Sequence, residues 1–369
     1  MVKNPYKSMV YKVDWFAFTV SDDIDTNNEE ENDFLLLKNL GYDFDDFEAV
    51  PGRYFYNSGL TLGGYVNVYY NNYDKDLARN TSHSRNYVFT GQGSTDLAQK
   101  VENDWVGLFS ILKKLGIKIT RIDIALDDFY GVVNFNKMEN KLNKGHYRSS
   151  KKTYNVVKKA DVNGDIKGYT LYIGSQNKSS VGTYFLRCYD KYAQYKTKVQ
   201  IPPQEAIDSG IWQRYEISFT KKKARKIVDL MVDGGQTIGS VFMNTMRDIV
   251  EFLEPTKTQE KEVHKNKNRW EVSTWWKKFL DGAGKVELGE AERDLDLGGL
   301  LRWLRVSVVP ALKLLEELGQ EKDFDIHEII KEIAPQEYSK KQNRLFNNAM
   351  KRPKSDILRY LKKFKEGEL

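Results

Sequence analysis

The chain has 369 residues, of which 40% are hydrophobic and 13% aromatic, so it is long and apolar enough to bury a core and is not a disordered chain. It contains no apolar run near 18 residues, which excludes a membrane-spanning helix, and its first twenty residues lack the pattern of an export signal. Its single cysteine, Cys188, excludes an intramolecular disulfide and a cysteine-cluster zinc site. We therefore expect a cytoplasmic protein with no membrane partner.

The 58 basic and 52 acidic side chains are unevenly distributed, although the formal net charge is only +6. Residues 22–48 are strongly acidic, whereas residues 141–159 carry seven Lys or Arg and no carboxylate. Two further basic clusters lie at 221–226 and 339–354. Charge runs are often only solvated faces, but three of them suit contact with phosphates. The candidate DNA-binding residues are Lys151, Lys152, Lys158, Lys159, Lys221, Lys222, Lys223 and Arg225.

The sequence up to about residue 220 consists mainly of short stretches rich in β-branched and aromatic residues, bounded by Gly, Asn, Asp or Ser. In chain order, strands are predicted at 13–20, 61–70, 87–90, 117–126, 169–173, 184–188 and 213–219, and helices at 95–115 and 136–143. This mixture predicts an α+β fold, with a largely antiparallel sheet as its core and helices flanking it.

The C-terminal third has a different character. Residues 227–253 and 300–318 have helical periodicity, and 335–368 are polar, basic and compatible with helix. We place a domain boundary at 254/255, because the following residues are charged and nearly free of large apolar side chains until Trp270. The expected domains are 1–254 and a mostly helical 255–369, the latter for DNA binding or oligomerisation. Its aromatic residues, which favour a local core over a base-stacking surface, are Trp270, Trp275, Trp276 and Phe279.

Three of the predicted strands carry charged or reactive residues at every second position, with apolar residues between them. The alternating sets are Arg121, Asp123 and Asp127, then Arg187, Tyr189 and Lys191, and then Arg214, Glu216 and Ser218. In one sheet, these sides would converge. Their carboxylates are hard ligands that suit Mg²⁺ or Mn²⁺, and a tyrosine, a metal and guanidinium groups together can perform phosphoryl transfer. The alternative is that each side is solvated and forms cross-strand ion pairs.

In order and spacing, several segments resemble the replication initiation factor family, which includes rolling-circle Rep proteins of Gram-positive plasmids and related relaxases of conjugative elements and phages. The resemblance covers roughly residues 10–225. Its segments are 15–19 (WFAFT), 91–93 (GQG), 121–128 (RIDIALDD), 174–175 (GS), 187–191 (RCYDK) and 214–216 (RYE). The C-terminal third matches the family less clearly.

The resemblance implies a nicking enzyme in residues 1–254, in which Tyr189 attacks a DNA phosphodiester to leave a 5′-phosphotyrosyl link and a free 3′-hydroxyl. Asp123 and Glu216 would be ligands of Mg²⁺ or Mn²⁺, with Asp127 as a weaker third, while Arg187 and Lys191 would contact phosphate. The implied partners are an origin of replication or transfer that is single-stranded at the nick, a host helicase and a second copy of the chain.

Other interpretations remain open at this point. The protein could be a conjugative relaxase with the same chemistry, a DNA-binding regulator without activity, or a metal-dependent nuclease that uses water. Tyr192 is the main rival nucleophile, whereas Tyr184 alternates onto the apolar side of its strand. The four histidines contain no His-x-His pair, so the histidine-paired metal site of the other large class of nicking enzymes is absent.

Overall fold

The computed structural model forms two compact units, which are described separately. The first comprises Met1–Gln194 and Pro203–Glu292, and the second comprises Tyr195–Pro202 and Arg293–Leu369. The structure describes residues 9–25, 34–71, 84–175, 183–197, 202–257, 263, 265–284, 301, 304–334, 337, 343, 346, 349–350 and 354–366.

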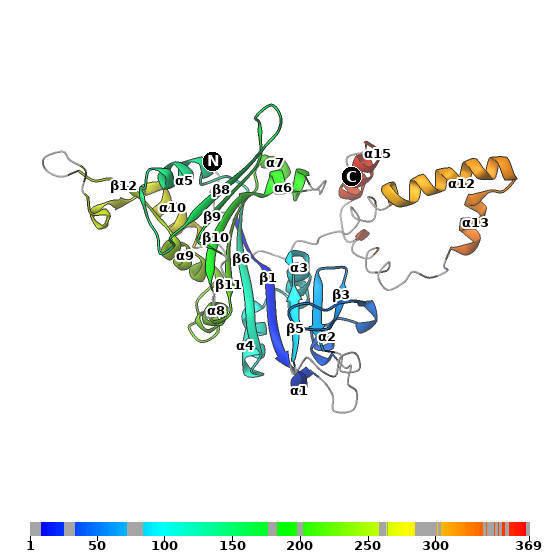
Figure 1. The fold of residues 1–369 in the computed structure, drawn as a ribbon, viewed down its shortest axis with the longest axis horizontal. Helices are drawn as coiled ribbons and strands as arrows, with labels where there is room; N and C mark the ends of the chain where they lie inside the picture. The colour runs from blue at the N-terminus through cyan, green and yellow to red at the C-terminus, as the bar shows by residue number, and fades with distance from the viewer. Residues whose placement is uncertain are drawn as a thin grey trace. The chain divides into compact units, whose positions relative to one another are not determined.

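A ten-stranded sheet forms the centre of the first unit, in the order β2-β3-β4-β5-β1-β6-β11-β10-β9-β8, and neighbouring strands run antiparallel (Figure 1). The strands are β1 (Met9–Ser21), β2 (Glu48–Pro51), β3 (Ser58–Leu62), β4 (Val66–Tyr70), β5 (Ser84–Phe89), β6 (Lys118–Asp128), β8 (Tyr154–Ala160), β9 (Ile166–Ile173), β10 (Tyr184–Asp190) and β11 (Gln213–Thr220). The antiparallel α+β prediction is confirmed.

Helices pack on the apolar side of the central strands. They are α1 (Asp22–Asp25), α2 (Leu35–Asn39), α3 (Gly91–Lys100), α4 (Trp105–Lys114), α5 (Phe135–Asn143), α8 (Lys222–Val232), α9 (Ile238–Ile249) and α10 (Thr274–Ala283), whose apolar side chains belong to or pack against the main core. Two further helices, α6 (Lys191–Thr197) and α7 (Gln204–Ser209), lie between β10 and β11 in the chain. Ring contacts join strand to helix, for example Phe16 with Phe109 of α4 at 5.5 Å between centroids. The charged residues therefore project from the opposite side of the sheet.

The first unit continues well past the predicted boundary at 254. A second, three-stranded sheet joins β13 (Glu271–Val272), β12 (Glu251–Glu254) and β7 (Tyr147–Arg148), and α10 follows it. Trp276 and Phe279 of α10 are fully buried in the core that also holds the strands, and Trp276 lies edge-on to Phe252 at 4.9 Å. The division near Glu292 corrects the predicted one, and these two aromatic residues belong to the core.

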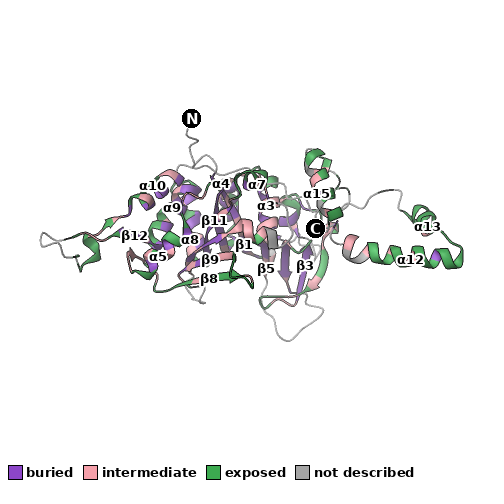
Figure 2. Ribbon diagram, turned by 90° about the horizontal axis from the view of Figure 1, so that it is seen from above, coloured by how far each residue is buried: buried purple, intermediate pink, exposed green. Residues whose placement is uncertain are grey.

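The second unit is helical, as predicted. It contains a short π-helical segment (Leu304–Val308), α12 (Val309–Lys322), α13 (Ile326–Ile333) and α15 (Lys354–Glu366), with Leu301 and Tyr360 buried together. Figure 2 shows α12 and α13 largely exposed, whereas the strands of the first unit are mostly buried. Most of the basic cluster at 339–354 lies outside the described residues. None of the described helices is long and apolar enough to cross a membrane.

Candidate functional site

Three adjacent strands, β6, β11 and β10, bring the predicted reactive residues onto one face of the sheet. In the strand register Glu216 lies opposite Arg187 on one side and Ala125 on the other, while Ser218 lies opposite Asp123. Arg214 likewise lies between Tyr189 and Asp127. Because residues opposite one another point to the same side of a sheet, the alternating sets form one continuous group.

Tyr189 lies beside Glu216 near the middle of this face. Its side chain is buried, and its hydroxyl donates a hydrogen bond of 3.2 Å to Glu216 Oε2. The same carboxylate accepts from Arg187 Nη2 at 2.5 and 2.6 Å, and the Arg187 guanidinium lies 4.9 Å from the centroid of the Tyr189 ring. Burial raises the pKa of Tyr189 well above its usual value. The phenol therefore holds its proton and donates it in the hydrogen bond to Glu216.

Asp123 is the second buried carboxylate on this part of the face. It accepts hydrogen bonds from Arg121 Nε at 2.9 Å and Nη2 at 2.5 Å, and from Ser218 Oγ at 2.6 Å. Burial raises the pKa of both Asp123 and Glu216. The negative charges of Asp14 and Asp123 raise the pKa of Glu216 further, which places these carboxylates within electrostatic range of one another.

Asp127 lies at the other end of the face, where it pairs with a different set of residues. Arg214, which is fully buried, donates from Nε and Nη2 to Asp127 at 2.6 Å each and from Nη1 to Asp14 at 2.6 Å. Lys12 Nζ lies 3.2 Å from Asp127. Burial alone would raise the pKa of Asp127, but Arg214 and Lys12 outweigh it, so that pKa lies well below its usual value.

This arrangement does not fit Asp127 as a third metal ligand. Asp123 and Asp127 are four residues apart along a strand, a separation of about 13 Å that one ion does not bridge. Among the described residues, no three His, Cys, Asp or Glu side chains come close enough to hold a metal ion. Asp14 and Lys12 were not among the residues predicted for this site. Asp14 could have been noticed as the only charge within the predicted strand 13–20.

Lys191, expected near the phosphate, belongs to the Arg214 end of the face. It begins α6 (Lys191–Thr197), its Nζ lies 5.3 Å from the centroid of the Trp212 ring, and its backbone N–H donates to Trp212 O at 2.8 Å. Burial, helped by the charge of Arg214, lowers its pKa to about 8. Tyr192 follows in the helix and is therefore off the sheet face. Of the two tyrosines, Tyr189 is the one bonded to Glu216.

The predicted DNA-binding residues lie in two neighbouring places. Lys158 and Lys159 are exposed on the edge strand β8, where Lys158 Nζ lies 2.9 Å from Glu139. Lys151 and Lys223 come from the two different basic runs, yet both lie over the ring of Tyr184, at 3.2 and 5.3 Å from its centroid. Lys152, Lys221 and Lys222 are exposed, and Arg225 is half-buried.

Comparison with known proteins identifies the family. The sequence pattern of the family described as Replication initiation factor matches residues 117–333, which include β6, β10 and β11. The chain belongs to the replication initiation factor family. The family match extends past residue 225, where the resemblance of individual segments ended, and includes part of the second unit.

One curated relative and one solved structure are similar to this chain. Putative DNA relaxase NicK of Bacillus subtilis (strain 168) is 24% identical over 269 residues, which are 70% of this chain and 71% of the relative. The solved structure of a rolling circle replication initiator protein from Geobacillus stearothermophilus matches with a TM-score of 0.60 and 22% identity. It covers 77% of this chain and 100% of that one, and at this identity it establishes the fold.

Proposed function

We propose that this replication initiation factor is a site-specific DNA nicking and rejoining enzyme that uses Tyr189 to start rolling-circle replication. One observation carries the proposal. The hydroxyl of Tyr189 donates a hydrogen bond to Glu216, which also accepts from Arg187, on the face that three adjacent strands share. The names of the relatives, a rolling circle replication initiator and a DNA relaxase, support the same chemistry. A DNA-binding regulator without activity would not need this arrangement.

The proposed reaction exchanges one phosphoester for another. The Tyr189 oxygen forms a bond to phosphorus as the bond from phosphorus to the 3′-oxygen breaks, which leaves a 5′-phosphotyrosyl link. The phenol proton passes to Glu216 Oε2, which already accepts its hydrogen bond, and the 3′-oxygen takes a proton from solvent. Arg187, and Arg121 beside Asp123, would donate hydrogen bonds to the non-bridging oxygens. Rejoining is the reverse reaction.

We also propose that Mg²⁺ or Mn²⁺ is held by Asp123 and Glu216. Two carboxylates fit such an ion, because Mg²⁺ is often bound by one or two carboxylates, with water and substrate phosphate oxygens completing its coordination. When bound, the ion would act as a Lewis acid on the phosphate. Each carboxylate is paired with an arginine, so binding of the ion would require these arginines to turn towards the phosphate.

Chelation tests the metal directly. Excess chelator should abolish relaxation of supercoiled DNA that carries the protein's own origin, and Mg²⁺ or Mn²⁺ should restore it. Zn²⁺ should restore it poorly, since Asp123 and Glu216 offer no soft donor. Full activity in chelator would remove the metal from the proposal and leave the tyrosine chemistry standing.

Tyr189→Phe tests the nucleophile. The ring still packs below Arg187 and only the hydroxyl is lost, so the fold and the affinity for DNA should be nearly unchanged. Nicking and the covalent adduct, seen as a shifted band with a labelled oligonucleotide on a denaturing gel, should both disappear. Tyr192→Phe is the matched control and should keep both. The reverse pattern would make Tyr192 the nucleophile, and cleavage without an adduct in any variant would favour hydrolysis by water.

The relative named as a DNA relaxase supports a second role with the same chemistry, in which nicking begins conjugative transfer. The two roles differ in the DNA that is cut. An origin of transfer beside a coupling ATPase gene, rather than a replication origin beside this gene, would assign the protein to conjugation.

A further inference from the structure

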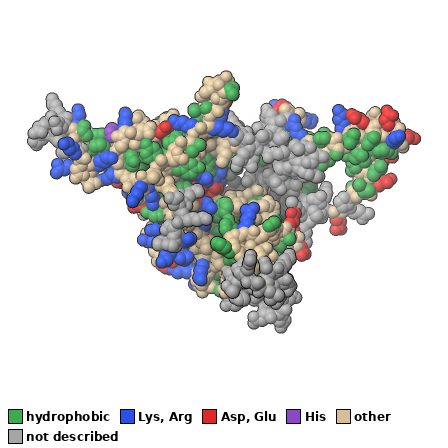
Figure 3. Space-filling view, in the orientation of Figure 1, with side chains coloured by type: hydrophobic (Ala, Val, Ile, Leu, Met, Phe, Trp, Pro, Cys, Tyr) green, Lys and Arg blue, Asp and Glu red, His purple; other side chains and the backbone are tan. Residues whose placement is uncertain are grey.

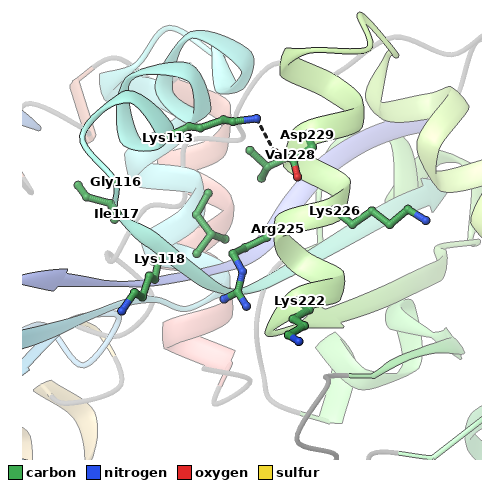
Figure 4. A pocket seen from close by; sticks show the side chains of 10 residues that line it. Lys113, Gly116, Ile117, Lys118, Lys222, Arg225, Lys226, Val228 and Asp229 are labelled. Atoms are coloured by element: carbon green, nitrogen blue, oxygen red, sulfur yellow. Dashed lines mark hydrogen bonds and ion pairs between the residues drawn. The ribbon is translucent and has the colours of Figure 1, made fainter.

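A basic pocket of about 410 Å³ lies where β6 begins and α8 follows the end of β11 (Figure 4). Three elements form it, namely the end of α4 with the turn after it, the first residues of β6, and α8. None of the catalytic residues proposed above lines it. The lining residues are Lys113, Gly116, Ile117, Lys118, Ile119, Lys222, Arg225, Lys226, Val228 and Asp229.

The charge of this lining is strongly unbalanced. Five of the ten residues are Lys or Arg and only one, Asp229, is acidic. Asp229 Oδ1 forms an ion pair with Lys113 Nζ at 2.5 Å. In the described part of the chain, no carboxylate lies within ion-pair distance of the four remaining cations, which are Lys118, Lys222, Arg225 and Lys226. Cations gathered without counter-charges repel one another, so an anion bound here would relieve that repulsion.

The backbone and the side-chain spacing favour an anion at the same place. Lys222, Arg225 and Lys226 are at positions i, i+3 and i+4 of α8 and so share one side of its first turns. No side chain caps the N-terminus of this 11-residue helix, and the free N–H groups of a helix start attract anions. In Figure 4 the charged ends of Lys118 and Arg225 point to the same side of β6, while Lys226 extends away from them.

The pocket lies past the end of β11, the strand that carries Arg214 and Glu216 of the candidate nicking site. Thr220, the last residue of β11, is opposite Arg121, and Tyr189 is opposite Arg214, six residues earlier on β11. Six residues of a strand span about 20 Å. A stacked single strand of DNA, with a phosphate roughly every 3.4 Å, covers this distance in about six nucleotides, and an extended strand covers it in fewer. Figure 3 shows Lys and Arg side chains gathered around α8 on the same part of the surface.

We infer that this pocket binds a backbone phosphate of the strand that Tyr189 cuts, through Lys118, Lys222 and Arg225. The inference rests on the proposed nicking function and adds a fixed second contact, within about six nucleotides of the scissile phosphate. Such a contact would hold the strand in register while Tyr189 is buried against Glu216.

The test compares two double variants with the same loss of charge. Lys118→Ala with Arg225→Ala removes two pocket cations, while Lys114→Ala with Lys277→Ala removes two exposed lysines of α4 and α10 that do not line the pocket. We expect the salt dependence of single-stranded DNA binding, the slope of log K against log[salt], to fall by about 0.7, the value for one phosphate, for the pocket variant and to stay unchanged for the control. Circular dichroism should show both variants folded.

Oligonucleotides with a single uncharged methylphosphonate linkage locate the contact. The neutral group is placed in turn at each linkage near the nick. At one linkage away from the scissile phosphate it should lower the affinity of the wild-type protein for the oligonucleotide. The same substitution should not lower the affinity of the pocket variant. Equal slopes and equal methylphosphonate profiles for the two double variants would overturn the inference, even if Tyr189 forms its adduct. Failure of the proposed function is seen separately, as no adduct in the wild-type protein.

Inorganic pyrophosphate distinguishes a strand phosphate from a free one. We expect it to compete with DNA in the wild-type protein and much less in the Lys118→Ala, Arg225→Ala variant. Pyrophosphate binding that is lost in this variant while its DNA slope is unchanged would show a pocket for a small phosphate ligand and would overturn its assignment to DNA.

Discussion

Asp123 and Asp127 differ in what surrounds them, although they share a strand and a face. Asp123 accepts hydrogen bonds from Arg121 and Ser218, and burial raises its pKa. Asp127 is fixed by two hydrogen bonds from the buried Arg214 and by Lys12. Periodicity predicted that both project from the same side, but it could not predict the partners of each, because these depend on the register of β1 and β11 against β6.

Asp127→Asn should therefore destabilise the fold rather than remove a metal ligand. Loss of one partner leaves the buried Arg214 with Asp14 alone, and breaking a buried ion pair costs about 3 to 5 kcal/mol. The unfolding free energy measured with urea at pH 7 should fall by about 3 kcal/mol, the lower end of this range, because Asp14 still pairs with Arg214. Asp229→Asn, which removes an exposed carboxylate paired with Lys113, is the control and should change stability little.

The effect of Asp127→Asn should also depend on pH. Because the pKa of Asp127 is lowered in the folded protein, its ionisation stabilises the fold fully above its unfolded value of 3.8, and this contribution is lost as the pH falls towards the lower folded value. The difference in unfolding free energy between wild type and variant should stay constant from neutral pH to about 5 and narrow below about 4. A difference that widened in acid would contradict the ion pair.

At the level of elements, strands and short helices were predicted better than the connections between them. The helix at 136–143 is α5, which begins after Asn134 caps its N-terminus. The single helix predicted at 95–115 is two, α3 and α4, because Glu102 and Asn103 adopt positive φ angles of 51° and 62° and Asp104 caps the second helix. A left-handed break of this kind has no signal in the periodicity, which continues on both sides of it.

The β8–β9 ribbon provides a prediction at this scale. Its lysines are not equivalent, since Lys158 is paired with Glu139 and burial lowers the pKa of Lys151 to about 8, while Lys152 and Lys159 are exposed. Replacing Lys152 and Lys159 with alanine should weaken binding to single-stranded DNA of any sequence and reduce the salt slope by about 1.4. The Lys151→Ala, Lys158→Ala pair should reduce it less. Equal slopes for wild type and both pairs would place the DNA on another surface.

For the whole molecule, the sequence predicted a catalytic part followed by a helical part but placed the division too early. The charged segment after Pro255 reads as a linker, yet the chain returns to the first unit as β13 and α10. Trp275 and Trp276 are sequence neighbours whose aromatic character suited either a core or a base-stacking surface. The contact of Trp276 with Phe252 selects the core, and that contact depends on the fold of the segment between them.

Two truncated chains test this division. A chain ending at Glu292 keeps β1, β6, β10 and β11, every proposed catalytic residue and the main core, so it should unfold cooperatively and still form the Tyr189 adduct with an oligonucleotide. A chain ending at 254 lacks α10 and thus Trp276 and Phe279, which are both fully buried.

The loss of α10 is too large for the remaining structure to absorb. Removing even one buried Trp or Phe side chain typically costs about 3 to 5 kcal/mol, and a domain is stable by only about 5 to 15 kcal/mol in total. The chain ending at 254 should therefore be largely unfolded by circular dichroism and inactive. If that chain instead formed the adduct at the wild-type rate, this would contradict the conclusion that α10 and the sheet share one core. If the chain ending at Glu292 bound its origin but formed no adduct, the second unit would be needed for the chemistry.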